Sequence, residues 1–203
     1  MREEAGWVLA SASPRRGEIL RQLGLVFKVD SSGDSEPPRK ASESPSSYVR
    51  RVSRLKAAAV APRHPDSRII SADTVVVVED AVLGKPSCCS EARDMLRRLS
   101  GRRHEVLTGL CLTLTGDPLR VYSSATCSGV HFRRMSDSDI EWYLSTGEYR
   151  DKAGAYGIQG FASLFIDRIE GCYFNIVGFP VSEFAHLCRR AKINVIRELR
   201  VEK

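Results

Sequence analysis

The segment that most restricts the possible folds is RIISADTVVVVED, residues 68–80. Its run of β-branched residues is typical of a buried strand. AVLGKP follows almost at once, so the chain is expected to turn near Glu79 and Asp80 and form a hairpin. Two more apolar segments, residues 104–115 and 119–132, are separated by a Gly-Asp-Pro turn. Hairpins of this kind predict a mixed sheet and argue against a purely parallel one.

Amphipathic helical patterns alternate with the strands. The first helix is predicted to begin at Pro14, with Ser13 as its capping residue and Gly24 just after its end. Because the chain has no internal repeat and no clear linker, a single α/β domain over residues 1–203 is expected. The remaining helices are predicted over residues 45–60, 90–101 and 136–148 and from 180 onward. Ser90 is the expected cap of the second of these, and a capping box between Ser136 and Asp139 is expected at the start of the third. The remaining strands are predicted over residues 7–11, 25–30, 163–169 and 172–178.

Composition narrows the class of protein. Hydrophobic residues make up 42% of the chain and charged residues 28%, as in ordinary globular domains. No apolar run approaches the ~18 residues of a membrane helix. The first ten residues are too acidic for a signal peptide, so a cytoplasmic location is expected. The six cysteines form no CxxC pair and are expected to be free thiols.

The net charge of +6 does not by itself identify a partner. A basic surface attracts nucleotides and nucleic acids alike. The chain has neither a basic tail nor the alternation of basic and aromatic residues seen in single-strand binders. A nucleic-acid partner is therefore disfavoured.

Two stretches carry groups suited to phosphate chemistry. SASPRR, residues 11–16, lies where a strand becomes a helix, and helix N-termini favour anions. Its hydroxyls and guanidiniums match phosphate oxygens, although surface arginines on a capped helix are the alternative. SADT, residues 71–74, places Asp73 inside an apolar strand. A buried carboxylate requires a metal, a base or a cation as partner, whereas an exposed strand end would require none.

Two further stretches are richer in glycine. LGKP places Lys85 in a segment where the backbone can approach a phosphate, or simply turn. DKAGAYGIQG, residues 151–160, suits a loop against a ligand, and Gln159 can both donate to and accept from a base edge. A flexible connector is the alternative. Neither a dinucleotide-binding fingerprint nor a Walker A loop is present. Together the four stretches fit a nucleotide-phosphate hydrolase.

These stretches occur in one order with LRRLSGRRHEVLTG, YLSTGEYRDKAG and FNIVGFP, and the chain resembles the Maf family (septum formation inhibitor Maf-like proteins) from Leu9 to about Leu187. The resemblance implies a nucleoside triphosphate pyrophosphatase that depends on a divalent cation, Mg or Mn. It implies an elongated mixed sheet with flanking helices and two lobes around a deep cleft, similar to the inosine triphosphate pyrophosphatase fold, and often a homodimer.

The resemblance also assigns roles to residues. Asp73 would accept the proton of the attacking water, with Lys56 and Lys85 beside the triphosphate, and Glu36 would help Asp73 with the metal. Here Glu36 follows Ser35 where the family usually has two acidic residues. The phosphate-binding and base-reading residues would be Ser11, Ser13, Arg15, Arg16, Thr74 and Gln159.

In the family that the chain resembles, three of these positions distinguish substrate subgroups. Arg15, Thr74 and Gln159 follow the pattern of enzymes acting on dTTP and UTP. A 7-methyl-GTP enzyme tends to carry an aromatic residue, a glutamine and a glutamate there. The expected function is thus pyrimidine triphosphate hydrolysis. The alternatives are a pyrophosphatase for 7-methyl-GTP or another modified nucleotide, and a non-enzymatic regulatory binding protein of cell division.

Overall fold

The computed structural model describes residues 6–31, 33 and 37–200. The chain divides into two compact units. Unit 1 consists of Met1–Asp73, Thr108–Thr126 and Gly178–Lys203, and unit 2 consists of Thr74–Leu107 and Cys127–Val177. The expected cleft between two lobes concerns the relative placement of these units, and it stays a prediction, as does the single domain over residues 1–203.

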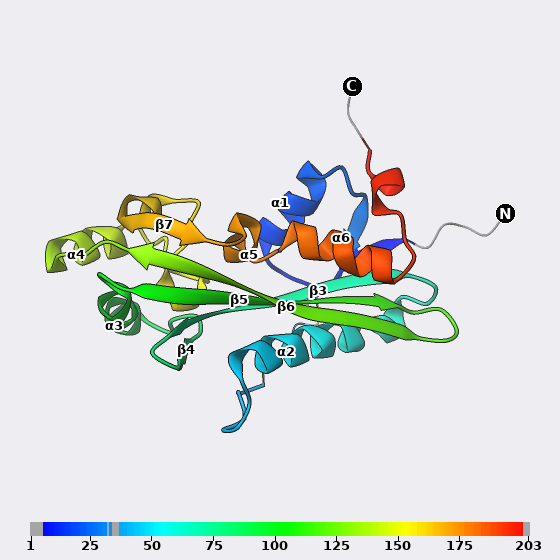
Figure 1. Ribbon diagram of the computed structural model, residues 1–203, viewed down its shortest axis with the longest axis horizontal. Coiled ribbons are helices and arrows are strands. Elements are labelled where there is room, and N and C mark those ends of the chain that lie inside the picture. Colours follow the sequence, from blue (N-terminus) through cyan, green and yellow to red (C-terminus); the bar gives the residue numbers. More distant parts are fainter. Residues whose placement is uncertain (1–5, 32, 34–36, 201–203) are drawn as a thin grey trace. The chain divides into compact units, whose positions relative to one another are not determined.

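The strands form one seven-stranded sheet of order β2-β1-β3-β5-β6-β7, with β4 paired to β3 (Figure 1). Strand β1 pairs in parallel with β2 and β3, whereas β4 is antiparallel to β3 and β7 to β6. The mixed sheet and the turn at Glu79 and Asp80, both of positive φ, are therefore confirmed. The strands are β1 (Trp7–Leu9), β2 (Phe27–Val29), β3 (Arg68–Val78), β4 (Ala81–Leu83), β5 (Arg103–Leu114), β6 (Arg120–Phe132) and β7 (Ile166–Glu170).

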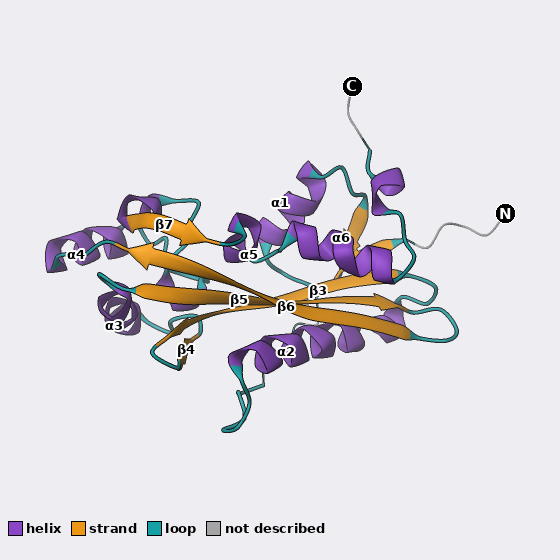
Figure 2. Ribbon diagram, in the orientation of Figure 1, coloured by secondary structure: helices purple, strands orange, loops and turns teal. Residues whose placement is uncertain are grey.

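Six α-helices and four short 3-10 helices complete the described part of the chain (Figure 2). The α-helices are α1 (Pro14–Gln22), α2 (Pro45–Val60), α3 (Cys89–Leu99), α4 (Asp137–Ser145), α5 (Tyr173–Val177) and α6 (Val181–Arg190). The 3-10 helices are η1 (Ala61–Arg63), η2 (Ala153–Ala155), η3 (Phe161–Phe165) and η4 (Val195–Glu198). The capping box predicted at the start of α4 is present, between Ser136 and Asp139.

In unit 1 the helices cover both faces of the strands. Because successive strand residues point to opposite faces, Trp7 and Val8 of β1 contact different helices. The Trp7 ring lies 5.6 Å from the ring of Phe184 in α6, whereas Val8 belongs to a buried cluster with Ala57 and Val60 of α2. Figure 1 accordingly shows α1 and α6 on one side of these strands and α2 on the other.

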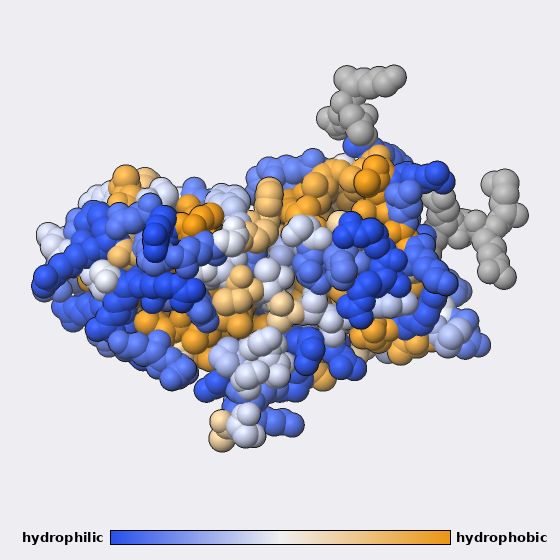
Figure 3. All heavy atoms as spheres, viewed as in Figure 1, coloured by the Kyte–Doolittle hydropathy of each residue, from blue (hydrophilic) through white to orange (hydrophobic). Residues whose placement is uncertain are grey.

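Unit 2 has its own core, built from β3, β5 and β6 residues against α3, α4 and the segment that follows α4. At its surface α3 and α4 are joined by ion pairs between Arg93 and Glu141 at 2.5 Å and between Arg97 and Asp137 at 2.9 Å. Hydrophilic residues gather over these two helices in Figure 3. Each pair is exposed, so it contributes little to stability.

Three element predictions are wrong in whole or in part. Residues 163–165 were expected to begin a strand but belong to η3, and β7 begins only at Ile166. Residues 172–178 were expected to be a strand but contain helix α5. Its Asn175 is fully buried and donates through Nδ2 to the Val106 carbonyl at 2.9 Å and to Ser128 Oγ at 3.0 Å. These tertiary hydrogen bonds override the β propensity of the local sequence. Helix α3 begins at Cys89, before the predicted cap Ser90, because the Glu91 carboxylate binds the amide and hydroxyl of Ser87.

None of the described helices is long and apolar enough to cross a membrane. All six cysteines are free thiols, as the sequence predicted.

The buried His104 generates a prediction about acid stability. Burial lowers the pKa of His104 from 6.5 to about 4, and its Nε2 lies 2.7 Å from the Tyr156 hydroxyl. The unfolded chain binds the imidazole proton near pH 6.5 and the folded protein only near pH 4. Between those values the unfolded state holds more protons, so stability falls on acidification, by ~3 kcal/mol in total. The unfolding free energy in urea, measured from pH 7 to pH 4, should show this loss.

A His104→Gln variant provides the control, because it removes the titrating group while keeping a side chain that hydrogen-bonds. Its stability should fall less steeply with acidification over the same interval, whatever its stability at pH 7. Equal slopes for the two proteins would contradict the role given to His104.

Candidate active site

The centre of the candidate site is a buried ion pair between Asp73 and Lys56. Asp73 lies on β3 and its side chain is 2% exposed, and Lys56 lies on α2 with 17% of its side chain exposed. Lys56 Nζ donates to Asp73 Oδ1 at 2.7 Å. The buried carboxylate therefore has the cationic partner that its place in an apolar strand required. Removing one member of such a pair leaves the other charge buried without compensation.

The period of the strand explains why the pair forms. Ile69, Ser71 and Asp73 alternate along β3 and so point to one face of the sheet. Ile69 packs in the α2 cluster and Ser71 Oγ donates to the Ser53 carbonyl of α2 at 2.6 Å. Asp73 is the next residue on that face, and it meets Lys56 one helical turn after Ser53. The three contacts together fix the register between strand and helix.

The neighbouring strand lets α2 approach closely. A Cβ atom at Gly109 of β5 would lie 2.2 Å from the carbonyl oxygen of Val49 in α2. Only glycine leaves room for a helix backbone at this distance. Gly109 thus allows α2 to pack directly on the sheet, with Lys56 within reach of β3.

A second group of predicted residues lies at the start of α1. Arg16 is only 8% exposed, donating through Nη1 to Ser11 Oγ and through Nε to the Gly178 carbonyl, both at 2.9 Å. Ser11 Oγ also accepts from the amide of Ser13 at 3.3 Å. The guanidinium is therefore held rigidly at the helix N-terminus, between the strand that precedes α1 and the segment that precedes α6.

Ser13 occupies the capping position of α1 as predicted, but in the described structure its side chain makes no capping hydrogen bond. Pro14 follows it, and the first turn contains no acidic residue. The positive end of the helix dipole therefore keeps its attraction for an anion. Arg15 is half-buried beside it.

The remaining predicted residues belong to unit 2. Lys85 and Gln159 are both exposed, and Thr74 is half-buried. Although Lys85 and Gln159 are far apart in sequence, their segments meet, because the Gly154 amide donates to the Gly84 carbonyl at 3.0 Å. Gly154 has a φ of +67°, and a Cβ there would lie 2.9 Å from Val76 Cγ2. The LGKP segment and the glycine-rich loop are thus parts of one structure.

Glu36, the expected second metal ligand, lies outside the described residues. Among the residues that are described, no three His, Cys, Asp or Glu side chains are grouped as metal ligands. Of the two residues that the sequence analysis assigned to the metal, Asp73 is the one that lies in the described part of the chain. An all-protein metal cage is not formed by this part of the chain.

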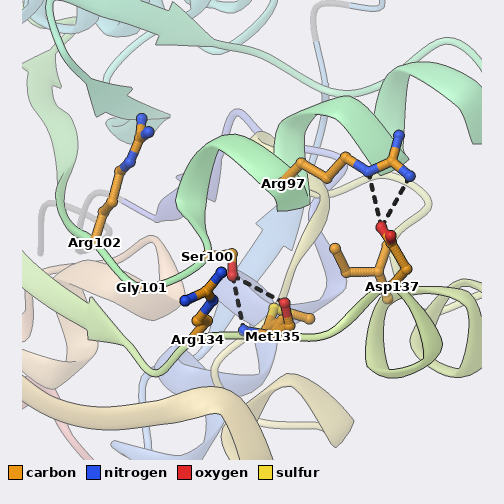
Figure 4. Close-up of a pocket in the computed structure, with 8 residues that line it drawn as sticks. Arg97, Ser100, Gly101, Arg102, Arg134, Met135 and Asp137 are labelled. Atoms are coloured by element: carbon orange, nitrogen blue, oxygen red, sulfur yellow. Dashed lines mark hydrogen bonds and ion pairs between the residues drawn. The ribbon is translucent and has the colours of Figure 1, made fainter.

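A hollow of about 490 Å³ in unit 2 contains none of the predicted site residues (Figure 4). Three arginines line it, but Arg97 is paired with Asp137, and Arg102 binds Glu79 at 2.8 Å and extends away from the other two in Figure 4. The Ser100 hydroxyl there is taken up by backbone atoms of Met135. The charges that line this hollow are largely paired with carboxylates, so the hollow is not the candidate site.

Sequence reasoning missed the groups that hold the site together. Gly109 and the carbonyl of Gly178 position Lys56 and Arg16, and neither carries a functional side chain. A glycine inside the apolar strand LTGLCL was the available signal for the first, since such a glycine often marks a close backbone approach. No sequence pattern predicts that the Gly178 carbonyl accepts a hydrogen bond from Arg16, 162 residues away.

The Gly109→Ala substitution should disturb the packing of α2 on the sheet without removing any functional side chain of the site. The added methyl group meets backbone atoms of α2, which no side-chain rotation relieves, so the helix must move away from the sheet. We expect a loss of ~1–3 kcal/mol in unfolding free energy, measured in urea. Gly6→Ala is the matched control, because a Cβ at Gly6 meets nothing within 4 Å. An unfolding midpoint equal to that of the control would contradict this account of the packing.

Comparison with known proteins gives the chain its family. Residues 6–191 match the family model described as "Maf-like protein". A protein of Anaeromyxobacter dehalogenans (strain 2CP-C) is 48% identical over 91% of this chain and 93% of its own length. One from Pyrococcus abyssi is 44% identical over 90% and 94%, and one from Clostridioides difficile (strain 630) 45% over 90% and 93%. All three relatives are named "dTTP/UTP pyrophosphatase".

Among solved structures, a HAM1 protein from Coxiella burnetii matches with a TM-score of 0.45 and 16% identity, over 64% of this chain and 74% of that one. A similarity this weak supports neither a fold assignment nor a function. The family match and the curated relatives each cover most of the sequence, and on that ground the chain belongs to the Maf family of Maf-like proteins.

Proposed function

We propose that this protein is a nucleoside triphosphate pyrophosphatase that hydrolyses dTTP and UTP, or modified pyrimidine nucleotides, to the monophosphate and pyrophosphate. The observation that carries the proposal is the buried Lys56–Asp73 pair at 2.7 Å in a chain 44–48% identical to relatives of that name. A buried, oriented carboxylate beside an ammonium is suited to proton transfer next to phosphate charge.

The proposed reaction is attack by water on the α-phosphorus. The bond from the α-phosphorus to the oxygen that bridges it to the β-phosphorus breaks, and pyrophosphate leaves with that oxygen. Asp73 accepts the proton that the water loses, and its hydrogen bond from Lys56 fixes the orientation of the carboxylate. Most of the rate enhancement comes from charges already in place, as is usual in phosphoryl transfer.

The phosphate groups are assigned to the first turn of α1 and to the two lysines. Arg16 and Ser11 form a rigid pair of donors at the positive end of the helix dipole. Ser13, whose hydroxyl is not used for capping, adds a third donor there. Lys56 and Lys85 neutralise the charge that develops on the leaving pyrophosphate.

The base is assigned to Arg15, Thr74 and Gln159. Thymine and uracil each present carbonyl acceptors and one N–H donor, and a glutamine amide both donates and accepts. Gln159 is exposed near the end of the glycine-rich loop, where a ligand has access to it.

A divalent cation, Mg or Mn, belongs to the proposal. Mg²⁺ is commonly held by one or two carboxylates together with substrate phosphates, so the Asp73 carboxylate fits such an ion. Glu36 is proposed as the second carboxylate. The cation would supply charge neutralisation at the phosphates.

The proposed enzyme acts on a free nucleotide, forms a homodimer and works in the cytoplasm. The free thiols suit a reducing compartment. The homodimer and the cytoplasmic location follow the expectations drawn from the sequence.

Pyrophosphate release from a panel of nucleotides tests the activity. The panel is dTTP, UTP, CTP, ATP, GTP, ITP and 7-methyl-GTP, each with Mg²⁺ or Mn²⁺. The wild-type protein should release pyrophosphate from dTTP and UTP, and Asp73→Asn should lose ~100-fold or more because it removes the proton acceptor. Urea unfolding shows whether the variant is folded.

The outcomes separate the candidate functions. Release from 7-methyl-GTP alone would keep the reaction and overturn the base assignment. Full turnover by a folded Asp73→Asn variant would overturn the role of Asp73. No release from any nucleotide would favour a regulatory binding protein instead.

Gln159→Glu tests the base assignment separately. A carboxylate only accepts hydrogen bonds, so it cannot donate to a pyrimidine carbonyl. We expect kcat/KM for dTTP and UTP to fall ~10-fold or more, because a site built to hydrogen-bond a base loses a partner. Ser163→Ala, an exposed position in the next segment, is the control. Unchanged kcat/KM for both nucleotides would remove Gln159 from the site.

A further inference from the structure

The carboxylate of Glu148 binds two different parts of unit 2. Glu148 lies three residues after α4 and is half-buried. Its Oε1 accepts from the Tyr143 hydroxyl at 3.1 Å, and its Oε2 accepts from the backbone amide of Phe161 at 2.7 Å. Tyr143 belongs to the core, whereas Phe161 follows the glycine-rich loop. One side chain therefore connects the loop to the core.

The core end of this connection is rigid. Tyr143 is fully buried between its neighbours in α4 and the ring of Phe165, 6.0 Å away. Burial, and after it the Glu148 carboxylate, raises the pKa of Tyr143, so its hydroxyl keeps its proton and donates. The carboxylate thus has a fixed partner on the side away from the loop.

The loop end is fitted around the same residue. A Cβ at Gly160 would lie 2.1 Å from Glu148 Oε2, so the absence of a side chain lets the loop backbone lie directly against the carboxylate. Lys152 donates through Nζ to the Glu148 carbonyl, and its Cε would lie 2.6 Å from a Cβ at Gly157. Gln159 stands between these two glycines. The density of glycine here reflects close packing on Glu148 and Lys152.

We propose that Glu148 is a positioning residue for substrate recognition. Its carboxylate holds the backbone of residues 157–161 and thereby presents the Gln159 amide in one orientation. The inference rests on the proposed function of Gln159 as a base-reading residue. Glu148 itself acts through the loop and need not touch the nucleotide.

Two substitutions separate position from charge. Glu148→Ala removes both acceptors. Glu148→Gln keeps one acceptor for the Phe161 amide and offers an N–H to the Tyr143 hydroxyl, which is able to accept. The glutamine variant should therefore rescue a positioning role, although it lacks the negative charge. Glu141→Ala is the control, since Glu141 is an exposed carboxylate of α4 paired with Arg93.

Amide hydrogen exchange of the full chain, read by mass spectrometry on peptides covering residues 157–161, tests the positioning directly. Exchange there should be ~10-fold faster in Glu148→Ala, which corresponds to the loss of about 1.4 kcal/mol of local protection. It should stay near the wild-type rate in Glu148→Gln and Glu141→Ala. A wild-type rate in Glu148→Ala, or an equal increase in Glu148→Gln, would overturn the proposal.

Kinetics then test the consequence for recognition. The ratio of kcat/KM for UTP to kcat/KM for ATP should fall ~10-fold in Glu148→Ala, mainly through KM for UTP, and recover in Glu148→Gln. An unchanged ratio in an active Glu148→Ala variant would overturn the role in recognition. If the wild-type protein released no pyrophosphate from any nucleotide, the proposed function would fail, and exchange alone would still decide whether Glu148 holds the loop.

Discussion

The site depends on the direct contact between the backbone of α2 and the sheet. Gly109 lacks the side chain that would separate them, and the Val49 carbonyl occupies that space. From this contact the alternating residues of β3 meet α2 in succession, through Ser71 to the Ser53 carbonyl and through Asp73 to Lys56. A displacement of the helix by even an ångström would lengthen the 2.7 Å ion pair and leave two buried charges poorly compensated. The close packing of α2 on the sheet is thus also what holds the Lys56–Asp73 ion pair together.

The arginine at the start of α1 follows the same principle on the other face of the sheet. Arginine in a first helical turn is unfavourable toward the helix dipole, and an anion nearby would remove that cost. Arg16 is nevertheless held by Ser11 and by a carbonyl from the segment before α6. Two hydrogen bonds fix the guanidinium before any ligand arrives. Such preorganisation is what electrostatic stabilisation of phosphate charge requires, because little free energy is then spent on ordering the side chain.

Much of the fold could be predicted because local signals agreed with the tertiary structure. The β-branched run and its turn at Glu79 and Asp80, and the capping box at Ser136, each depend on residues close in sequence. Helix α5 could not be predicted, because buried Asn175 donates hydrogen bonds to the Val106 carbonyl and to Ser128 Oγ, more than forty residues away. The place of Asp73 in an apolar strand predicted that its carboxylate has a partner, but the identity of that partner, Lys56, depends on how α2 packs.

The glycine-rich loop shows why composition alone misjudges such a segment. Three glycines within ten residues suggested either a ligand loop or a flexible connector. In the structure Gly154 fits against Val76, Gly157 against Lys152 and Gly160 against Glu148. At each glycine a neighbouring side chain occupies the place where a Cβ would lie, and Gly154 also has a φ of +67°. A loop packed this closely loses the freedom that glycine gives an unfolded chain, and that entropy cost is offset by hydrogen bonds such as the one from Phe161 to Glu148. The segment that carries Gln159 is therefore ordered by its contacts with Lys152 and Glu148.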